Sequence, residues 1–234
     1  MEHLFRFKQF TIQHQRSSMK VGTDAVLLGA WCELDGARRV LDVGTGCGVI
    51  ALMVAQRTTE ADIWAIDIDS ASVDEARENF LHSPWSDRLQ VRQEDFNNLA
   101  DADGFDLIVT NPPYYNENVL PPDAVRSAAR HTHSLSFDQL MRGAARLLKS
   151  DGSIALITPV EARDAVTSAA TFAGLNLSRL TAVHSSEGKP SKRLLWQWRK
   201  QRCVIQRDTL TLHQKGGIPT PQYRELCQDF YLHF

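Results

Sequence analysis

Apolar and polar positions alternate along this chain in the pattern of a parallel α/β protein. Short apolar runs, typical of buried strands, are separated by longer amphipathic segments that are typical of helices. The predicted strands are 40–43, 63–66, 89–91, 107–109, 154–157, 177–184 and 194–205, and the predicted helices are 23–34, 48–57, 70–82, 134–149 and 161–173. We therefore expect a doubly wound α/β fold, in which a mostly parallel seven-stranded sheet carries helices on both faces and a C-terminal antiparallel strand.

Length and composition fit one globular domain. The 234 residues are 43% hydrophobic and 23% charged, and no internal repeat or linker interrupts them. Within this domain we distinguish an N-terminal extension with a basic segment and a helix (1–37), a core (38–160), and sheet-closing strands with a C-terminal tail (161–234). The predicted helix N-caps are Ser70, Ser134 and either Thr23 or Asp24.

Charge and cysteine usage narrow the functional classes. The net charge of −2 is no nucleic-acid signature, so any basic patch has to be local. The chain starts without the apolar region of a signal peptide, and no apolar run approaches the ~20 residues of a membrane span. The four cysteines are widely spaced and form no CxxC pair, which is typical of reduced thiols. We expect a cytoplasmic protein that binds neither a metal nor a membrane.

The tetrad Asn111-Pro112-Pro113-Tyr114 follows the apolar run 105–110. Neither proline can donate to a parallel ladder, so the strand has to end there. This leaves a carboxamide, rigid carbonyl groups and an aromatic ring at the carboxyl edge of the sheet, where open α/β sheets bind ligands. Such acceptors suit a planar amino group such as adenine N6, which indicates chemistry on an exocyclic nitrogen. A rigid turn without a catalytic role is the alternative for this tetrad alone.

A glycine-rich turn follows the first core strand and opens a helix. Glycines at such a turn let backbone N–H groups approach a ligand closely at a helix N-terminus. The spacing is GxGxG, with Val49 where a dinucleotide fingerprint has its third glycine, so a NAD or FAD site is disfavoured. A purely structural turn is the alternative. The candidate residues of this turn are Asp42, Gly44, Gly46 and Gly48.

Acidic residues end the next two strands. Asp67 ends the second strand, where a carboxylate can accept hydrogen bonds from ribose hydroxyls. Asp95 ends the third strand, where it could accept from an adenine amino group while Phe96 lies beside the ring. Each acid taken singly could instead cap a helix. Their order along successive strands, ahead of the tetrad at Asn111, favours one shared ligand site.

Together these residues resemble the class I S-adenosylmethionine-dependent methyltransferases, a Rossmann-like family, over roughly 38–160. The resemblance implies that the glycine turn holds the methionine portion of the cofactor, Asp67 the ribose and Asp95 the adenine amino group. The tetrad is similar to the NPPY motif of the branch that methylates amino nitrogens. In that setting the Asn111 and Pro112 carbonyl oxygens would accept the N6 hydrogens as the nitrogen pyramidalises, and Tyr114 would stack on the base.

Both ends of the chain point to one family within that branch. The segment 7–24 and the ending 223–234 resemble the bacterial tRNA1(Val) (adenine(37)-N6)-methyltransferases, so the likeness spans nearly the whole chain. It implies methylation of adenine 37 in the anticodon loop of a valine tRNA. It also implies that Lys20, Thr23 and Asp24 line the cofactor pocket. Helix capping by Thr23 or Asp24 is an equally good physical interpretation.

A local basic run supports RNA binding. Between 188 and 207 the chain has seven basic residues and no acid, interleaved with Trp196 and Trp198. Bases with aromatic rings suit a phosphate track with stacking. The alternative is a half-buried strand over 194–199 whose bases face water. The RNA-binding candidates are Arg16, Lys189, Lys192 and Arg193.

Other features carry weaker predictions. His131 and His133 have no cluster of acids or thiols nearby and are interpreted as surface residues rather than metal ligands. The segment 115–133 is predicted to be a loop beside the active site. The competing functions are N-methylation of adenine or guanine in ribosomal RNA, methylation of a protein glutamine, and a non-catalytic RNA-binding scaffold. No obligate protein partner is evident.

Overall fold

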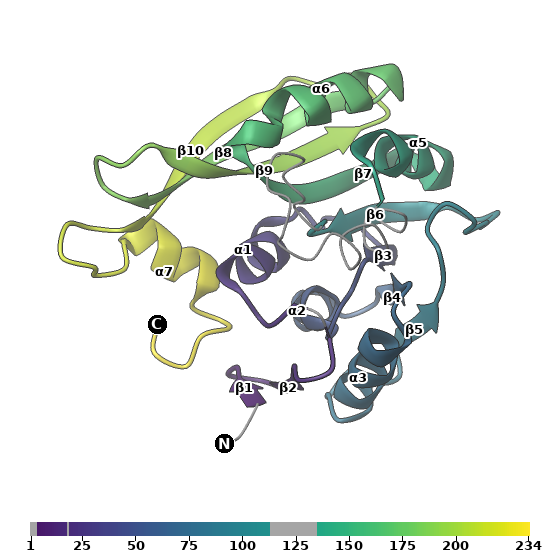
Figure 1. The fold of residues 1–234 in the computed structure, drawn as a ribbon, viewed down its shortest axis with the longest axis horizontal. Helices are drawn as coiled ribbons and strands as arrows, with labels where there is room; N and C mark the ends of the chain where they lie inside the picture. The colour runs from purple at the N-terminus through teal and green to yellow at the C-terminus, as the bar shows by residue number, and fades with distance from the viewer. Residues whose placement is uncertain (1–3, 18, 113–134) are drawn as a thin grey trace, which may run out of the picture.

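One large sheet divides the structure into two helical layers (Figure 1). A computed structural model describes residues 4–17, 19–112 and 135–234. The strands are β1 (Leu4–Arg6), β2 (Thr11–Gln13), β3 (Arg39–Val43), β4 (Asp62–Asp67), β5 (Leu89–Gln93), β6 (Phe105–Thr110), β7 (Leu148–Pro159), β8 (Asn176–Ser186), β9 (Ser191–Arg199) and β10 (Gln206–His213). The helices are α1 (Thr23–Trp31), α2 (Val49–Arg57), α3 (Ser70–Leu81), α5 (Phe137–Leu147), the 3-10 turn η1 (Val160–Ala162), α6 (Arg163–Phe172) and α7 (Pro221–Cys227).

Within the described residues the large sheet has eight strands in the order β10-β8-β9-β7-β6-β3-β4-β5. β9 runs antiparallel to its neighbours β7 and β8, and the other adjacent pairs are parallel. The prediction of an α/β, mostly parallel sheet with helices on both faces is confirmed.

The predicted strand count was wrong. The expected strand 194–205 is β9, which ends at Arg199, and a further strand, β10, follows it and pairs in parallel with β8. The antiparallel strand is therefore the second-last strand along the chain. β10 lies at the edge of the sheet and exposes residues 206–209. It lacks the continuous apolar run by which buried parallel strands are recognised.

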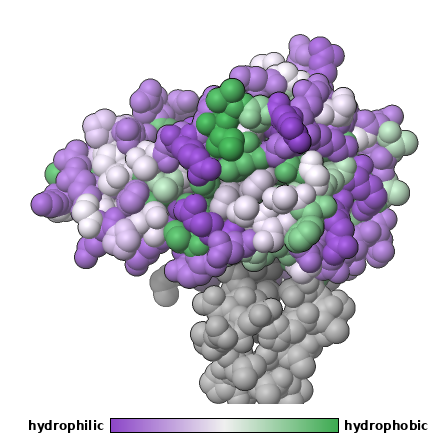
Figure 2. Space-filling view, turned by 90° about the horizontal axis from the view of Figure 1, so that it is seen from above, coloured by the Kyte–Doolittle hydropathy of each residue, from purple (hydrophilic) through white to green (hydrophobic). Residues whose placement is uncertain are grey.

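Alternate strand positions face opposite helical layers. Val40 of β3 and Ile157 of β7 pack in the hydrophobic cluster that includes residues of α1, α2, α3 and α7. Leu41 and Leu156, one position away, pack in the second cluster, with α5 and α6. Seen from the side of α6, the surface is mainly hydrophilic and apolar residues form small patches (Figure 2). A shift of one residue in a strand would exchange its contacts with the two buried clusters, so these clusters set the register of the sheet.

The first and last segments of the chain lie together at one side of the molecule (Figure 1). The N–H of Lys8 donates to the carbonyl oxygen of Phe230 at 2.9 Å. The rings of Phe7 and Tyr231 stack with centroids 6.2 Å apart. The C-terminal tail thus supports the β1–β2 hairpin, which leads into the segment before α1.

The N-caps of α3 and α5 differ from expectation. The N-cap of α3 is Asp69, one residue before the predicted Ser70. The N-cap of α5 is Ser136, which forms a capping box, whereas the predicted Ser134 lies outside the described residues. None of the helices in the described part of the chain is long and apolar enough to cross a membrane.

Candidate active site

A cavity of about 250 Å³ opens at the carboxyl edge of the sheet, where β3 and β6 end. Its wall comes from three stretches of the chain: the segment entering α1, the turn after β3, and the residue after β6. The fold thus brings the predicted cofactor turn and the predicted amide acceptor into one cavity. The predicted site residues that line it are Lys20, Thr23, Asp24, Gly44, Gly46 and Asn111.

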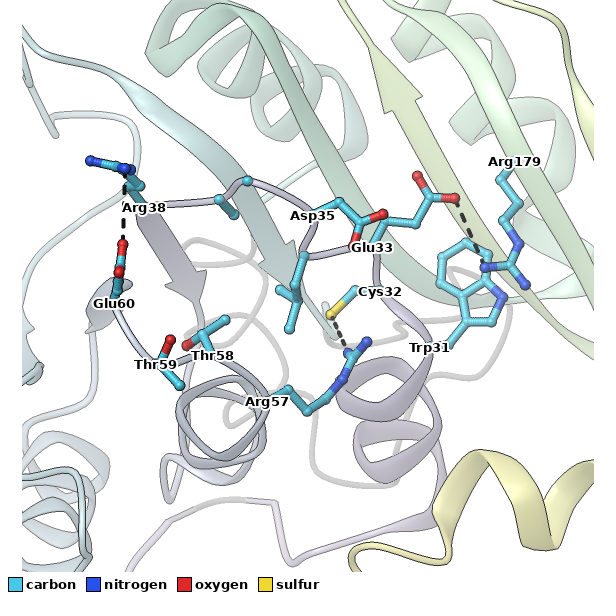
Figure 3. A pocket seen from close by; sticks show the side chains of 13 residues that line it. Trp31, Cys32, Glu33, Asp35, Arg38, Arg57, Thr58, Thr59, Glu60 and Arg179 are labelled. Carbon is cyan, nitrogen blue, oxygen red and sulfur yellow. Dashed lines mark hydrogen bonds and ion pairs between the residues drawn. The ribbon is translucent and has the colours of Figure 1, made fainter.

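A larger hollow of about 590 Å³ lies at the opposite, amino edge of the sheet (Figure 3). None of the predicted site residues lines it. Two ion pairs lie among its charged side chains, one between Arg38 and Glu60 and one between Arg179 and Glu33. In parallel α/β sheets ligands bind at the carboxyl ends of the strands. The smaller cavity is therefore the candidate active site.

The glycine turn presents bare backbone to this cavity. Gly44 and Gly46 have φ of 68° and 54°, a region that favours glycine, and a Cβ on either would meet nothing within 4 Å. Gly48 is different, because a Cβ there would lie 2.5 Å from the Phe80 ring of α3. The structure therefore places Gly44 and Gly46 at the ligand side and Gly48 at the packing of α2 against α3.

Asp42 lies fully buried beneath the turn. Its Oδ2 accepts from Thr45 Oγ1 at 2.7 Å and from the Ala51 N–H at 3.2 Å. Among the described residues its Oδ1 has no hydrogen-bond partner. Burial raises the pKa of this carboxyl to about 7. Asp42 therefore stabilises the turn through the hydrogen bonds to its Oδ2. Its Oδ1 remains as an acceptor, and a nearby positive charge would stabilise the ionised carboxylate.

Asp67 ends β4 beside the same turn. Its Oδ2 accepts from the Gly46 N–H at 2.9 Å, and its Oδ1 accepts from the Asp69 N–H at 3.0 Å. Burial raises the pKa of Asp67. The next residue, Ile68, is 48% exposed. An apolar side chain left exposed at the ligand edge is suited to contact a flat ring, and sequence periodicity alone did not single it out.

Asp95 and Phe96 take different positions after β5. Asp95 is half-buried, and its Oδ1 accepts from the backbone and side-chain nitrogens of Asn97. Phe96 is only 3% exposed and lies in the core against Gly143 of α5, where a Cβ would approach its ring to 2.4 Å. Asp95 thus remains available at the edge. The predicted place of Phe96 beside an adenine ring is wrong, because the ring is taken up by core packing.

The segment before α1 is held by two polar residues of α3 that sequence reasoning missed. Glu75 accepts from the N–H groups of Gln15, Arg16 and Ser17. Burial opposes its ionisation, but these hydrogen bonds prevail and lower the pKa of Glu75. The sequence did contain a signal for this role, because Glu75 and Asn79 lie four positions apart on a mainly apolar helix face, where polar side chains need hydrogen-bond partners.

Asn79 connects this segment to the glycine turn. Its Oδ1 accepts from the Gln13 N–H at 2.8 Å. Its Nδ2 donates to the carbonyl oxygens of Gln13 and Cys47, each at 2.8 Å. One side chain therefore fixes the spacing between two walls of the cavity. Arg16, predicted to bind RNA, forms an ion pair with Glu78 of α3, and both side chains remain partly exposed.

Asp24 at the start of α1 and Arg193 of β9 form an ion pair. Arg193 Nε donates to Asp24 Oδ2 at 2.8 Å, although 169 residues separate them in sequence. The N-cap of α1 is Gly22, with no side-chain cap, so neither predicted capping residue caps this helix. Asp24 is engaged by Arg193 instead. The structure thus places Arg193, predicted to bind RNA, against the cofactor-side wall.

The basic run 188–207 is divided by β9 between the two edges of the sheet. Lys189 and Lys192 are exposed at the carboxyl edge, whereas residues 199–207 lie at the amino edge. Trp196 and Trp198 are 1% and 3% exposed and stack on each other in the core. The expectation that these rings stack on RNA is wrong. The alternative predicted a strand here, and β9 is one, but residues 194–198 are all buried, so it is not half-buried.

Comparison with known proteins identifies methyltransferases as the relatives of this chain. The family model described as "Methyltransferase small domain" matches residues 17–172. The tRNA1(Val) (adenine(37)-N6)-methyltransferase of Phocaeicola vulgatus is 44% identical over 97% of both chains. The protein of that name from Bacteroides thetaiotaomicron is 43% identical over 98% of this chain and 97% of its own.

The chain belongs to the tRNA1(Val) (adenine(37)-N6)-methyltransferase family.

A solved structure is similar to this methyltransferase in fold. A predicted O-methyltransferase from Agrobacterium tumefaciens has a TM-score of 0.69 at 23% identity, covering 88% of this chain and 96% of its own. At that identity the likeness concerns the fold alone. It agrees with the Rossmann-like class I architecture expected from the order of strands and helices.

The carboxyl edge of this methyltransferase fits S-adenosylmethionine. The open backbone of Gly44 and Gly46 leaves room for a ligand, and the buried, partnerless Oδ1 of Asp42 favours positive charge nearby. Asp67, Ile68 and Asp95 continue the edge over β4 and β5, beyond the cavity lining. An extended ligand with a zwitterionic amino-acid end, a sulfonium and a nucleoside end suits this row.

Other candidate chemistries are not supported at this edge. Cys47 lines the cavity, but burial raises the pKa of its thiol to about 12, so it is not a nucleophile at neutral pH. Within the described residues no group of three or more His, Cys, Asp or Glu is placed to hold a metal. Pro113, Tyr114, and the segment 115–133 with its two histidines lie outside those residues.

Proposed function

We propose that this protein transfers a methyl group from S-adenosylmethionine to N6 of adenine 37 in the anticodon loop of valine tRNA. The observation that carries the proposal is the position of Asn111. It directly follows β6 and lines the same cavity as Gly44 and Gly46. An amide acceptor beside the turn that holds a methyl donor is what N6 methylation requires. The names of the relatives supply the base and the tRNA.

The proposed mechanism relies on acceptors at the target nitrogen. S-adenosylmethionine supplies an electrophilic methyl group on a sulfonium. The N6 lone pair is delocalised into the adenine ring and is a poor nucleophile until the nitrogen pyramidalises. The Asn111 amide oxygen and the Pro112 carbonyl oxygen accept the N6 hydrogens and bind the developing positive nitrogen more strongly than the flat amine. The N–C bond forms as the C–S bond breaks, and one N6 proton is then lost to solvent.

We assign the remaining cofactor contacts by position along the edge. Asp67 accepts from the ribose hydroxyls, Ile68 packs on the adenine ring, and Asp95 accepts from the adenine amino group. The residues Lys20, Thr23 and Asp24 contact the methionine end. Tyr114, outside the described residues, is proposed to stack on the target base. Phe96 and Asp42 support this arrangement through their side chains, and Gly48 supports it by leaving room for the Phe80 ring.

The RNA is proposed to approach the carboxyl edge. Lys189 and Lys192 are exposed there, on and beside the turn between β8 and β9. Their charges suit phosphate groups flanking the target base. The chain acts as a single domain over 1–234, without an obligate protein partner. Because tRNA is used in the cytoplasm, the proposal places the protein there.

Methyl transfer to defined substrates tests this function. The assay follows labelled methyl from S-adenosylmethionine to an unmodified valine tRNA transcript. The comparison substrates are the same transcript with guanine at position 37, ribosomal RNA and a release factor. Label in the first substrate alone is expected. Label in the guanine-37 transcript would contradict the target base, and label only in ribosomal RNA or the release factor would contradict the substrate class.

A further inference from the structure

We propose that Asp24 binds the ammonium group at the methionine end of S-adenosylmethionine and that Arg193 is a positioning residue that holds Asp24 for this contact. The inference rests on the proposed function, since both residues act within the same cofactor site. It replaces the RNA-binding role that the sequence suggested for Arg193.

Asp24 has one carboxylate oxygen to offer. It lines the cavity at the start of α1, together with the bare backbone of Gly44 and Gly46. Its Oδ2 is occupied by Arg193 Nε at 2.8 Å. Among the described residues no side chain or backbone N–H donates to its Oδ1, and a carboxylate can accept on both oxygens. The second oxygen can therefore accept from an ammonium group in the cavity.

The charges of this wall complement an amino acid. Lys20 and Asp24 both line the cavity and lie four residues apart. They offer one cation and one anion, and the methionine end carries one α-carboxylate and one α-ammonium. The Asp24 side chain is 25% exposed, so the attraction is screened less than at an open surface. This wall is thus suited to the amino-acid end and not to the nucleoside end.

Arg193 is itself held in a defined position. It lies opposite Pro159, at the carboxyl end of β7, and its Nη1 donates to the Lys192 carbonyl oxygen at 3.1 Å. The Arg193 side chain is 35% exposed, which makes the pair with Asp24 sheltered rather than fully solvated. An arginine on a rigid strand can fix the rotamer of a carboxylate on a helix. Arg193 therefore acts through Asp24.

Two ligands that differ only at the amino-acid end separate this role from a purely structural one. S-adenosylhomocysteine carries the ammonium and carboxylate, and 5′-methylthioadenosine shares its adenosine and sulfur but lacks both. Titration calorimetry measures both ligands on Asp24→Asn, Arg193→Ala and Arg193→Lys. Arg202→Ala is the matched control, because it makes the same change on an exposed side chain at the other edge of the sheet.

Asp24→Asn and Arg193→Ala are expected to weaken S-adenosylhomocysteine binding by about tenfold or more, and 5′-methylthioadenosine binding by less than about twofold. Arg193→Lys should recover part of the loss, and Arg202→Ala should bind both ligands as the parent does. Unchanged S-adenosylhomocysteine affinity in Arg193→Ala would overturn the positioning role. An equal loss of affinity for both ligands would mean that the ion pair only stabilises α1, and it would overturn the recognition of the ammonium group.

A different result would contradict the proposed substrate. A parent protein that binds S-adenosylhomocysteine but does not methylate valine tRNA would contradict the proposed function. The difference between the two ligands would still decide the role of Asp24 and Arg193.

Discussion

Asp42 and Asp67 are acids whose burial raises their pKa values, yet they have different surroundings. Asp67 accepts a backbone N–H on each carboxylate oxygen. Asp42 concentrates its hydrogen bonds on Oδ2, and its Oδ1 has no partner among the described residues. Ionising Asp42 is therefore the more costly of the two in the unbound protein. A bound sulfonium and ammonium should favour the ionised form of both acids.

Asp42→Asn should change how stability depends on pH. The pKa of Asp42 is about 7 in the folded protein and has an ordinary value near 3.8 in the unfolded chain. Between these values the folded state binds the proton more tightly, so this carboxyl lowers stability progressively as pH rises from about 4 to 7 and not further above. Urea unfolding of the unbound protein from pH 5 to 8 measures this, and the variant should become relatively more stable towards pH 7.

The control for this prediction is the parent protein in the same buffers. Only the pH-dependent part of the difference is interpreted, because the asparagine amide also changes the hydrogen bonds to Thr45 and Ala51. Parallel stability profiles for parent and variant would show that Asp42 keeps an ordinary pKa.

Asn111→Ala should slow the chemical step more than it weakens cofactor binding. The substitution removes an acceptor that binds the reacting nitrogen most strongly in the transition state, so turnover should fall by about 10²-fold or more. Single-turnover methylation of valine tRNA measures the rate, and calorimetry with S-adenosylhomocysteine measures binding. Asn111→Asp, which keeps carboxyl acceptors at this position, should retain more activity. Equal rates for parent and Asn111→Ala would remove this side chain from the mechanism.

At the scale of elements, α3 organises the site without contributing a residue to the cavity lining. Its inner face packs Phe80 under Gly48, and its polar residues Glu75 and Asn79 hold the segment before α1. Asn79 also reaches the Cys47 carbonyl oxygen of the glycine turn. Because α3 contacts both the segment before α1 and the glycine turn, a change in its packing should change the shape of the cavity.

Glu75→Gln should destabilise the protein and weaken cofactor binding. The glutamine amide puts a donor where a carboxylate oxygen now accepts a backbone N–H, and an unpaired buried group costs ~1–3 kcal/mol. Glu78→Gln is the matched control, because this partly exposed residue of the same helix pairs with Arg16 at the surface. This substitution should cost less than ~1 kcal/mol. Urea unfolding and S-adenosylhomocysteine calorimetry measure the two effects. Similar losses in both variants would contradict the anchoring role of Glu75.

At the scale of the whole molecule, β9 carries the chain from one edge of the sheet to the other. Lys189, just before β9, and Lys192, at its start, lie at the carboxyl edge, where the cavity opens. The basic residues after it, such as Arg202 and Arg207, lie at the amino edge. The basic run of the sequence is therefore divided between two edges of the sheet, and one of them is the edge of the candidate active site.

Replacing both Lys189 and Lys192 with Ala should weaken tRNA binding and reduce its dependence on salt. Each phosphate contact contributes a slope of about 0.7–0.9 in a plot of log affinity against log salt, so the slope should fall by about one to two. Filter binding of valine tRNA across salt concentrations measures this. Replacing Arg202 and Arg207 with Ala is the matched control and should leave the slope unchanged. The reverse pattern would move the RNA to the amino edge.

Most of the core elements were predictable from local pattern. The runs ending at Val43, Asp67 and Thr110 are short, apolar and bounded by turn residues, so their positions follow from periodicity and from the prolines after Asn111. β10 was missed because an exposed edge strand lacks that apolar signal. Phe96 was misplaced because an aromatic ring after a strand suits a ligand and a core equally well, and only the close approach of α5 at Gly143 decides between them.

The sequence by itself determined the order of ligand-binding groups along the sheet edge, because parallel strands joined by helices bring all their carboxyl ends to one side. The glycine turn, Asp67, Asp95 and Asn111 needed no further information. Only the tertiary structure decided which partners the charged side chains take. Arg193 meets Asp24 across 169 residues, and β9 buries its tryptophans. Such choices depend on burial and on contacts between distant strands and helices, which local periodicity does not encode.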